Sequence, residues 1–316
     1  MVATKVVISF ALAPKWVETL VREFPPVEFR QSRDKAELES LVADADVIYG
    51  FRDQELAEQA PRLKWLHYYG AGVDGLKADY FERHGILCSN SRGVAAPNIA
   101  EHVMAMMLAF ARGLPRLARA QTAAMWVRNS EISVFELNGK RLGIAGLGAI
   151  GSELAKRALA FGMGVAGVRK SGAPVQGITV FTPDRMLELA AQSDHFAVCL
   201  PGTADTAGSI GRAVFSAMPR GGYFYNVGRG NIVVQDELIA ALESGQLAGA
   251  GLDVMDPEPL PSRSRVWQAP NLILTSHTSG NTDRYWERAV PLFARNLRAF
   301  LDGKPLDNLI DLRRGY

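Results

Sequence analysis

Cysteine is scarce in this sequence. Only two of the 316 residues are cysteines, Cys88 and Cys199, which excludes a disulfide framework and a four-thiolate zinc site. Each cysteine lies in a short apolar run, so we expect two buried free thiols and no metal site.

Long hydrophobic runs are also lacking. No apolar stretch approaches the roughly 20 residues that a membrane-spanning helix requires. Residues 6–13 imitate a signal peptide, but only Lys5 supplies the preceding positive charge, and Pro14 follows where cleavage would fall. We interpret this run as a buried first strand and expect a cytoplasmic protein.

An excess of charge of either sign is missing as well. The chain has 35 basic and 33 acidic residues, a formal net charge of +2. This balance argues against a protein that coats nucleic acid or an anionic membrane, so any anion must be recognised at a local site. The length favours two domains of ordinary size, and the composition is typical of a globular protein.

Short apolar runs alternate with helix-like stretches along the chain. Because the runs do not alternate with polar residues, we expect strands covered on both faces, as in parallel α/β sheets. A long helix begins at Pro97 with a methionine-rich stripe that we interpret as packing, and Gly113 and Pro115 break it. The expected strands are 5–10, 27–30, 46–50, 64–69 and 85–89, followed by 141–145, 165–169, 178–181, 195–200, 223–227, 249–254 and 271–276. The second series predicts a doubly wound sheet.

A glycine pattern follows the first strand of that second series. Gly146, Gly148 and Gly151 match G-x-G-x-x-G between an apolar strand and a helix, the context that a dinucleotide site requires. The first glycine permits a tight turn, the second lets the backbone approach a pyrophosphate, and the third packs helix on strand. The start of the helix, with Ala149 and Ile150, supplies amide donors. A purely structural glycine turn is the alternative.

The end of the next strand indicates which dinucleotide binds. An NAD site needs a carboxylate there, whereas this chain has Arg169, Lys170 and Ser171. Two cations and a hydroxyl would bind the 2′-phosphate of NADP, which a carboxylate would repel. A solvated basic turn is the alternative, and the missing acid favours NADP(H).

Three polar residues follow strands whose carboxyl ends meet at the cofactor crevice. A hydride acceptor that bears a carboxylate needs an arginine to bind it and a proton donor that titrates near neutrality, and Arg229 and His277 are of these types. A carboxylate beside the histidine, here Glu258, would stabilise its imidazolium form. Taken singly, each could be a surface charge, a structural histidine or a turn residue.

The whole set of motifs resembles the D-isomer-specific 2-hydroxyacid dehydrogenase family. The likeness runs over nearly the whole chain and rests on pieces in the same order as in the family. They are Gly70-Ala71-Gly72-Val73-Asp74, Asn98-Ile99-Ala100-Glu101-His102, the glycine pattern, Pro201-Gly202-Thr203, Asn226-Val227-Gly228-Arg229-Gly230, Leu252-Asp253-Val254 with Glu258-Pro259-Leu260, and His277.

The resemblance implies a role for each of these site residues. Arg229 would bind the substrate carboxylate and carbonyl, with His277 as acid/base and Glu258 as its partner. The amides of Ala71 and Gly72 would complete the carboxylate site, which also suits a glycine-rich turn on physical grounds. Further cofactor contacts would come from Pro201, Thr206, Val227, Gly228, Asp253 (to the nicotinamide amide), His277 and Ser279.

The resemblance also implies a fold and an assembly. A Rossmann cofactor domain, residues 97–283, would be inserted into a flavodoxin-like substrate domain made of residues 1–96 and 284–316. Both would be doubly wound parallel-sheet α/β domains. Members are usually homodimers through the cofactor domain, with residues 97–128 as the arm.

The implied activity is NADPH-dependent reduction of small 2-keto acids, of the glyoxylate or hydroxypyruvate type, to D-2-hydroxy acids. Arg169 in place of the NAD-type acid resembles the NADP-using glyoxylate and hydroxypyruvate reductases, and Glu258 argues against the formate dehydrogenase branch. Two alternatives stay open: a reductase for bulkier keto acids, with Tyr68, Tyr69 and Trp286 lining its pocket or packing in the core, and a dinucleotide-sensing binding protein of the same fold.

Overall fold

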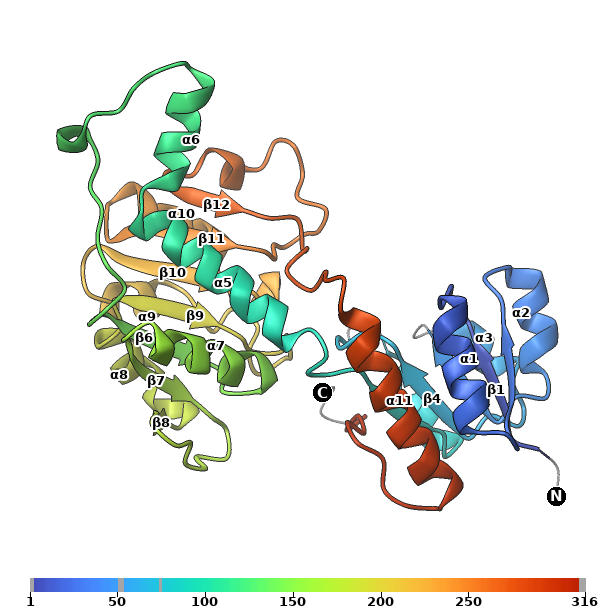
Figure 1. The fold of residues 1–316 in the computed structure, drawn as a ribbon. Coiled ribbons are helices and arrows are strands. Elements are labelled where there is room, and N and C mark those ends of the chain that lie inside the picture. Colours follow the sequence, from blue (N-terminus) through green and yellow to red (C-terminus); the bar gives the residue numbers. More distant parts are fainter. Residues whose placement is uncertain (1–2, 51–53, 74–75, 313–316) are drawn as a thin grey trace. The chain divides into compact units, whose positions relative to one another are not determined.

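The chain folds into two compact units in a computed structural model that describes residues 3–50, 54–73 and 76–312. Unit 1 is made of Met1–Val94 and Thr282–Tyr316, and unit 2 of Ala95–Asn281. Each unit is built around one parallel sheet (Figure 1). Both boundaries lie two residues before the expected ones, at 94 against 96 and at 281 against 283.

Unit 1 contains a five-stranded sheet in the order β2-β1-β3-β4-β5, which is the flavodoxin-like order. All of its neighbouring strands pair in parallel. The strands are β1 (Lys5–Ile8), β2 (Glu28–Gln31), β3 (Val47–Gly50), β4 (Trp65–Tyr68) and β5 (Leu87–Asn90). The helices are α1 (Pro14–Glu23), α2 (Lys35–Val42), α3 (Gln54–Glu58), α4 (Ala78–Arg83) and α11 (Tyr285–Leu301).

Alternate side chains of these strands serve two separate cores. Val6 and Ile8 pack with residues of α1 and α11, whereas Val7, between them, packs with residues of α2, α3 and α4 on the other face. Since successive strand residues point to opposite faces, a sheet covered on both sides needs the continuous apolar runs seen in the sequence.

Unit 2 contains a seven-stranded parallel sheet in the order β12-β11-β10-β9-β6-β7-β8. The chain winds outward from β6 to β8, then returns to the other side of β6 with β9, the doubly wound arrangement of a Rossmann domain. The strands are β6 (Arg141–Ala145), β7 (Gly164–Val168), β8 (Thr179–Phe181), β9 (His195–Val198), β10 (Gly222–Asn226), β11 (Leu247–Leu252) and β12 (Leu272–Leu274). The helices are α5 (Ala96–Ala111), α6 (Leu114–Thr122), α7 (Ala149–Ala160), α8 (Met186–Ala191), α9 (Arg212–Ala217) and α10 (Gln235–Glu243).

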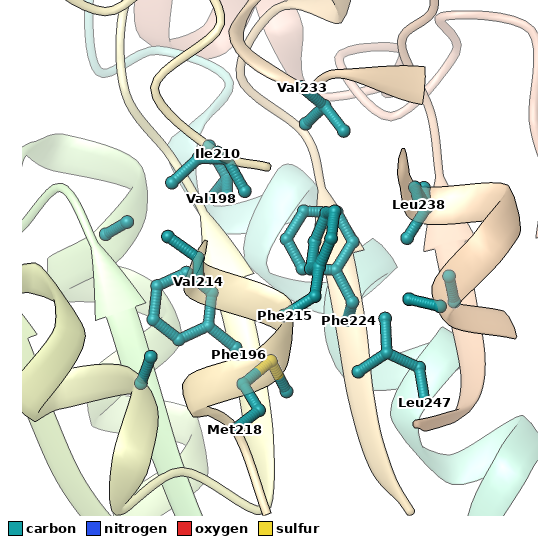
Figure 2. Packing of buried hydrophobic residues seen from close by; sticks show 14 of the residues in the cluster. Phe196, Val198, Ile210, Val214, Phe215, Met218, Phe224, Val233, Leu238 and Leu247 are labelled. Atoms are coloured by element: carbon teal, nitrogen blue, oxygen red, sulfur yellow. The ribbon is translucent and has the colours of Figure 1, made fainter. Parts of the chain in front are cut away.

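The same alternation divides the core of unit 2. Phe196 and Val198 of β9 pack beneath α8, α9 and α10, where Phe215 and Phe224 meet edge to face (Figure 2). Ala197 faces the other way, toward α5 and α7. The two layers cover the central strands on both faces, and the loops with the candidate site residues follow the carboxyl ends of these strands.

The methionine stripe of α5 packs as expected, because Met104, Met106 and Met107 are all buried. The role given to Pro115 was incomplete. Helix α5 ends at Ala111, but Pro115 lies in the first turn of a further helix, α6, where its missing N–H costs nothing.

The expectation of two buried thiols is wrong for one cysteine. Both thiols are free, but Cys88 is buried and Cys199 only half-buried. Cys199 follows the last residue of β9, where the strand gives way to a loop at the edge of the sheet. Burial raises the pKa of both thiols to about 12.

Candidate active site

The glycine pattern forms the turn between β6 and α7. Gly146 has a φ of +106°, and a Cβ there would lie 2.9 Å from the carbonyl oxygen of Cys199, so only glycine fits. A Cβ on Gly151 would lie 2.1 Å from the oxygen of Gly146, so this glycine lets the helix pack on the turn. A Cβ on Gly148 would meet nothing within 4 Å. A side chain would therefore collide with the backbone at the first and third glycines, whereas there is free space beside the second.

This geometry fits a dinucleotide. The open position at Gly148 lets a ligand approach the backbone, and it precedes the twelve-residue helix α7. The first amides of a helix have no acceptor within it, so Ala149, Ile150 and Gly151 present donors and a partial positive charge. The physical requirements of a pyrophosphate are therefore met at this turn.

The basic turn lies where β7 ends, beside β6. The Arg169 amide donates to the Phe181 carbonyl at 2.9 Å, which fixes the backbone, while the side chains of Arg169, Lys170 and Ser171 are exposed. The Arg169 guanidinium has no hydrogen bond or ion pair within the described part of the chain. Lys170 Nζ lies 3.9 Å from Asp205 Oδ2, and this pair is exposed. The turn presents cations at the end of the second Rossmann strand, as expected.

The loop after β9 is closed by one hydroxyl. Thr206 Oγ1 donates to the Pro201 carbonyl at 2.6 Å and accepts from the Thr203 amide at 2.8 Å. A Cβ on Gly202 would lie 2.8 Å from Cγ of Arg229. The structure therefore gives Thr206 a loop-closing role, and its contact with a cofactor stays a prediction.

Arg229 lies on a loop held by the side chain of Asn226. Asn226, which is buried at the end of β10, accepts from the Gly228 amide at 3.0 Å and donates to the Arg229 carbonyl at 2.9 Å. The Arg229 guanidinium, half-buried, donates from Nη1 to the Gly228 carbonyl at 2.8 Å. Asn226 thus fixes the backbone from which the arginine extends, a role that the sequence analysis missed.

The same loop makes close backbone contacts with Leu200 on one side and with Met255 on the other. A Cβ on Gly228 would lie 2.6 Å from the Leu200 carbonyl oxygen, and one on Gly230 would lie 2.0 Å from the Met255 carbonyl oxygen. The loop carrying Arg229 is therefore pressed against the segment that leads to Glu258. The buried Val227 donates its amide to Val198 at 3.1 Å, which continues the β9–β10 pairing.

Glu258 and His277 meet within hydrogen-bond distance. His277 Nδ1 lies 2.7 Å from Glu258 Oε2, and Oε1 of Glu258 accepts from the Met255 amide at 2.9 Å. An ionised carboxylate can only accept, so Nδ1 carries the proton of this bond and Nε2 is the nitrogen left for exchange. The imidazole is half-exposed, and within the described chain nothing bonds to Nε2. This is the arrangement that a general acid/base requires.

Asp253 organises the five residues 275–279, which we call the histidine segment. Its carbonyl accepts from the His277 amide at 2.8 Å. Its carboxylate, only 1% exposed, accepts from Thr275 Oγ1 at 2.6 Å, the Thr278 amide at 2.9 Å and the Ser279 amide at 3.1 Å. The Ser279 hydroxyl donates to it as well.

These bonds also set the ionisation of Asp253. Burial acts to raise the pKa of the carboxyl, but the hydrogen bonds from Ser279, Thr275 and the two amides outweigh burial and lower the pKa overall. They also hold His277 at a φ of +54°, which costs a residue other than glycine about 1 kcal/mol. The carboxylate and the Ser279 hydroxyl are thus engaged by the segment itself, and their contacts with a cofactor stay predictions.

Helix α5 contacts the histidine segment with two side chains one turn apart. Asn98 Nδ2 donates to the Ser279 carbonyl at 2.7 Å, and His102 Nε2 lies 2.9 Å from Thr275 Oγ1. Both residues belong to a motif that carried the resemblance, but the sequence analysis gave them no role. Helical spacing of i and i+4 placed them on one face, yet nothing in the sequence indicated what that face meets.

The glycine-rich turn at Ala71 and Gly72 lies in unit 1, after β4. The Ser91 amide donates to the Gly70 carbonyl at 2.9 Å, and Asn90 Nδ2 donates to the Ala71 carbonyl at 2.8 Å. The amides of Ala71 and Gly72 have no acceptor among the described residues. The turn is thus anchored by its carbonyls and presents its amides, as an anion site requires. Asp74 lies outside the described residues.

Two of the three aromatic residues considered for a side-chain pocket belong to the core of unit 1. Trp286 stacks on Phe10 with ring centroids 5.1 Å apart and an interplanar angle of 12°, and Tyr69 packs against both rings. The Tyr285 hydroxyl donates to the Tyr69 carbonyl, which fixes the end of β4 against α11. Core packing therefore accounts for Tyr69 and Trp286.

No helix in the described parts of the chain has the length and apolar character to cross a bilayer. Two doubly wound sheets with a glycine-rich β6–α7 turn define a two-unit α/β protein whose second unit is a Rossmann dinucleotide-binding domain. The family model described as "D-isomer specific 2-hydroxyacid dehydrogenase, NAD binding domain" matches residues 104–279. The chain belongs to the D-isomer-specific 2-hydroxyacid dehydrogenase family.

Characterised relatives carry different activities. The glyoxylate reductase of Pyrococcus furiosus is 30% identical over 97% of this chain and 95% of its own length. The D-3-phosphoglycerate dehydrogenase of Methanocaldococcus jannaschii is 30% identical over 93% of this chain, and that of Archaeoglobus fulgidus 31% over 93%. The chain spans little more than half of these two phosphoglycerate dehydrogenases, 57% and 53% of their lengths.

Solved structures of the family match nearly the whole chain. A D-isomer specific 2-hydroxyacid dehydrogenase family protein from Aeromonas salmonicida has a TM-score of 0.88 at 30% identity and covers 98% of this chain and 99% of its own. A D-isomer specific 2-hydroxyacid dehydrogenase from Xanthobacter autotrophicus Py2, in complex with NADPH and MES, has a TM-score of 0.85 at 27% identity. It covers 99% of this chain and 100% of its own.

Proposed function

We propose that this protein reduces small 2-keto acids, of the glyoxylate or hydroxypyruvate type, to D-2-hydroxy acids with NADPH. The observation that carries the proposal is the pair of His277 and Glu258, 2.7 Å apart, in the unit that also holds Arg229 and the dinucleotide turn. A dinucleotide-sensing protein would have no use for a proton donor held in this way.

Arg229 binds the carboxylate of the substrate in this proposal. A guanidinium pairs with a carboxylate through two parallel hydrogen bonds, which orients the keto group as well as holding it. The Asn226 side chain and the contacts at Gly228 and Gly230 fix the loop, so the arginine is positioned before the substrate arrives. The amides of Ala71 and Gly72 are proposed to bind the same carboxylate.

His277 then delivers a proton to the keto oxygen. Its Nδ1–H bond to Glu258 leaves Nε2 for this transfer and stabilises the imidazolium before the proton leaves. The nicotinamide cofactor, when bound, supplies the hydride that reduces C2. One hydride at C2 and one proton at the oxygen convert the carbonyl group into the alcohol, and the reverse oxidation returns the proton to Nε2.

Residues of the β6–α7 turn would hold the cofactor pyrophosphate, and the basic turn would select NADPH. The exposed Arg169, Lys170 and Ser171 follow β7 with no acid at the position where NAD-binding domains need one. The NADPH found in the Xanthobacter autotrophicus structure supports the same choice. Steady-state kinetics with both cofactors should give a higher kcat/KM for NADPH, and a preference for NADH would overturn the cofactor assignment.

A substrate panel tests the activity itself. NADPH oxidation should be measured with glyoxylate, hydroxypyruvate, phenylpyruvate and 3-phosphohydroxypyruvate at matched concentrations. The two small keto acids should give the highest kcat/KM. Preference for phenylpyruvate would identify a reductase for bulkier keto acids, and tight NADPH binding without turnover of any of them would support the sensor.

We also propose a cytoplasmic homodimer in which α6 contributes to the interface. None of the residues of α6 is buried, and the following Trp126 is 92% exposed with Met125 66% exposed. Such apolar side chains usually mark a surface that a partner covers. Light scattering should give twice the chain mass, and W126A/M125S should lower it toward that of a monomer.

A further inference from the structure

One imidazole joins helix α5 to the histidine segment. His102 Nε2 lies 2.9 Å from Thr275 Oγ1 and 3.8 Å from Asp253 Oδ1. Neither the dinucleotide turn nor the pair of Glu258 and His277 requires this contact. His102 lies on a helix with no other group in the proposed chemistry, yet it touches the segment two residues from His277.

The available protons fix the direction of these bonds. The Thr275 hydroxyl has one proton, and Asp253 Oδ1 lies 2.6 Å from its oxygen. The Asp253 carboxylate, which already receives bonds from Thr278 and Ser279, is held in its ionised form and can only accept. Thr275 must therefore donate to Asp253 and accept from His102, so His102 carries a proton on Nε2.

We propose that His102 is a positioning residue, whose Nε2–H donates to Thr275 Oγ1, directs the Thr275 hydroxyl to Asp253 and so fixes the segment that presents His277 to Glu258. The inference rests on the proposed role of His277 as proton donor. It adds the contact between His102 and Thr275 that helps to position His277.

The position of Thr275 explains how the effect reaches His277. The Thr275 amide donates to the Leu252 carbonyl at 2.9 Å and the His277 amide to the Asp253 carbonyl at 2.8 Å, so both ends of this short stretch are tied to β11 and the residue after it. On the amino-terminal side of His277 the Thr275 hydroxyl donates to the Asp253 carboxylate, and on the other side the backbone amides of Thr278 and Ser279 donate to it. Losing the Thr275 bond would release a backbone that is held at an unfavourable φ of +54°.

Matched variants separate the hydrogen bond from simple packing. His102→Gln keeps an N–H donor on a side chain of similar reach, whereas His102→Leu fills similar space without one. Thr275→Ser and Thr275→Val form the corresponding pair at the acceptor. We expect kcat to fall about tenfold in H102L, the equivalent of one hydrogen bond, and at least as far in T275V, which also loses the bond to Asp253. The KM for NADPH should stay unchanged in both. The Gln and Ser variants should restore kcat to within about threefold of the wild type.

A double mutant tests whether the two residues act through one contact. H102L/T275V should be no slower than T275V alone, because T275V already removes the bond that H102L removes, together with the Thr275 bond to Asp253. Unchanged kcat in H102L, equal losses in H102Q and H102L, or additive losses in the double mutant would overturn the proposal. If H102L unfolds in a thermal melt, the comparison of T275V with T275S tests the same hydrogen bond.

Nuclear magnetic resonance tests the inference without substrate. Two-bond ¹H–¹⁵N spectra report which imidazole nitrogen is protonated, and loss of one of five histidine patterns in H102Q identifies His102. We expect a proton on Nε2, and a neutral ring protonated on Nδ1 alone would overturn the proposal. T275V should also shift the His277 signals while T275S leaves them in place. These signals decide the inference even if no keto acid is reduced, a result that would defeat the proposed function alone.

Discussion

The histidine segment and the basic turn of unit 2 are built in opposite ways. Residues 275–279 donate hydrogen bonds to the Asp253 carboxylate and are bonded by Asn98 and His102, and the His277 imidazole is held by Glu258. Arg169 extends from β7 with no partner in the described chain, and Lys170 lies 3.9 Å from the exposed Asp205.

The difference follows from what each part is proposed to do. Proton transfer requires a donor within a few tenths of an ångström of its place, so the groups around it are arranged in advance. A phosphate can be bound by exposed cations that form their hydrogen bonds only when it arrives, so their side chains need not be held in advance. We therefore expect large losses of activity from changes around the histidine segment, and small losses that affect one cofactor from changes in the basic turn.

The largest effect should come from the imidazole itself. His277→Gln removes the group that is proposed to transfer the proton, so we expect kcat for keto acid reduction to fall by about 10³-fold, within the range of general acid catalysis. NADPH binding, measured by fluorescence titration, should stay near the wild-type value as a control for folding. A loss of less than about tenfold would remove His277 from its proposed role.

Arg229→Lys should have the next largest effect. Lysine keeps the charge but cannot form two parallel bonds, so we expect kcat/KM for the keto acid to fall by about 10²-fold. The KM for NADPH serves as the control and should stay unchanged. Equal activity of the Lys variant and the wild type would show that charge alone is needed.

Asp253→Asn weakens the hydrogen bonds between the side chain of residue 253 and the histidine segment. The amide would place N–H groups against a backbone donor, and we expect about 3 kcal/mol less stability at pH 7, measured by urea denaturation. The pKa of Asp253 is lowered in the folded state, so its ionisation stabilises the protein above the ordinary pKa of about 4. This contribution is lost as the pH falls through the folded-state pKa, so the difference between variant and wild type should shrink in acid. A difference that is constant from pH 7 to pH 3 would contradict this account.

The smallest and most selective effect is expected at the basic turn. R169A/K170A should raise the KM for NADPH about tenfold or more and leave kinetics with NADH within about twofold, because only NADPH carries the 2′-phosphate. Arg220→Ala, on the same unit, is a matched control for loss of an exposed positive charge. Equal losses with both cofactors would show that the turn does not select a phosphate.

Much of the fold could be predicted from the sequence, because buried parallel strands require apolar runs. The strands at Val6 and Ile144 are examples, and the glycine pattern indicated its own turn. Helices α3 and α4 could not be predicted in this way, since five or six residues are too few to show a helical period. Helix α6 was missed because Pro115 was taken as the end of a helix and not as the start of another.

The residues that hold the site were harder to predict than those that were proposed to act in it. Arg229, Glu258 and His277 could be selected from the sequence because carboxylate binding and proton transfer need an arginine, a histidine and a carboxylate partner. Asn98 meets its partner Ser279 across 181 positions of the chain, and a buried asparagine or aspartate can satisfy many different neighbours. Only the folded arrangement shows which backbone groups these side chains bind.

The close approach at Gly230 has a consequence for engineering. A single methyl group there would push the Arg229 loop away from Met255, and Met255 in turn donates its amide to Glu258. The loop proposed to bind the carboxylate and the pair proposed to deliver the proton therefore depend on the same backbone contact, so a change at Gly230 would affect both. Libraries that randomise position 230 should return glycine alone among active clones, so new substrate scope has to be sought elsewhere in the chain.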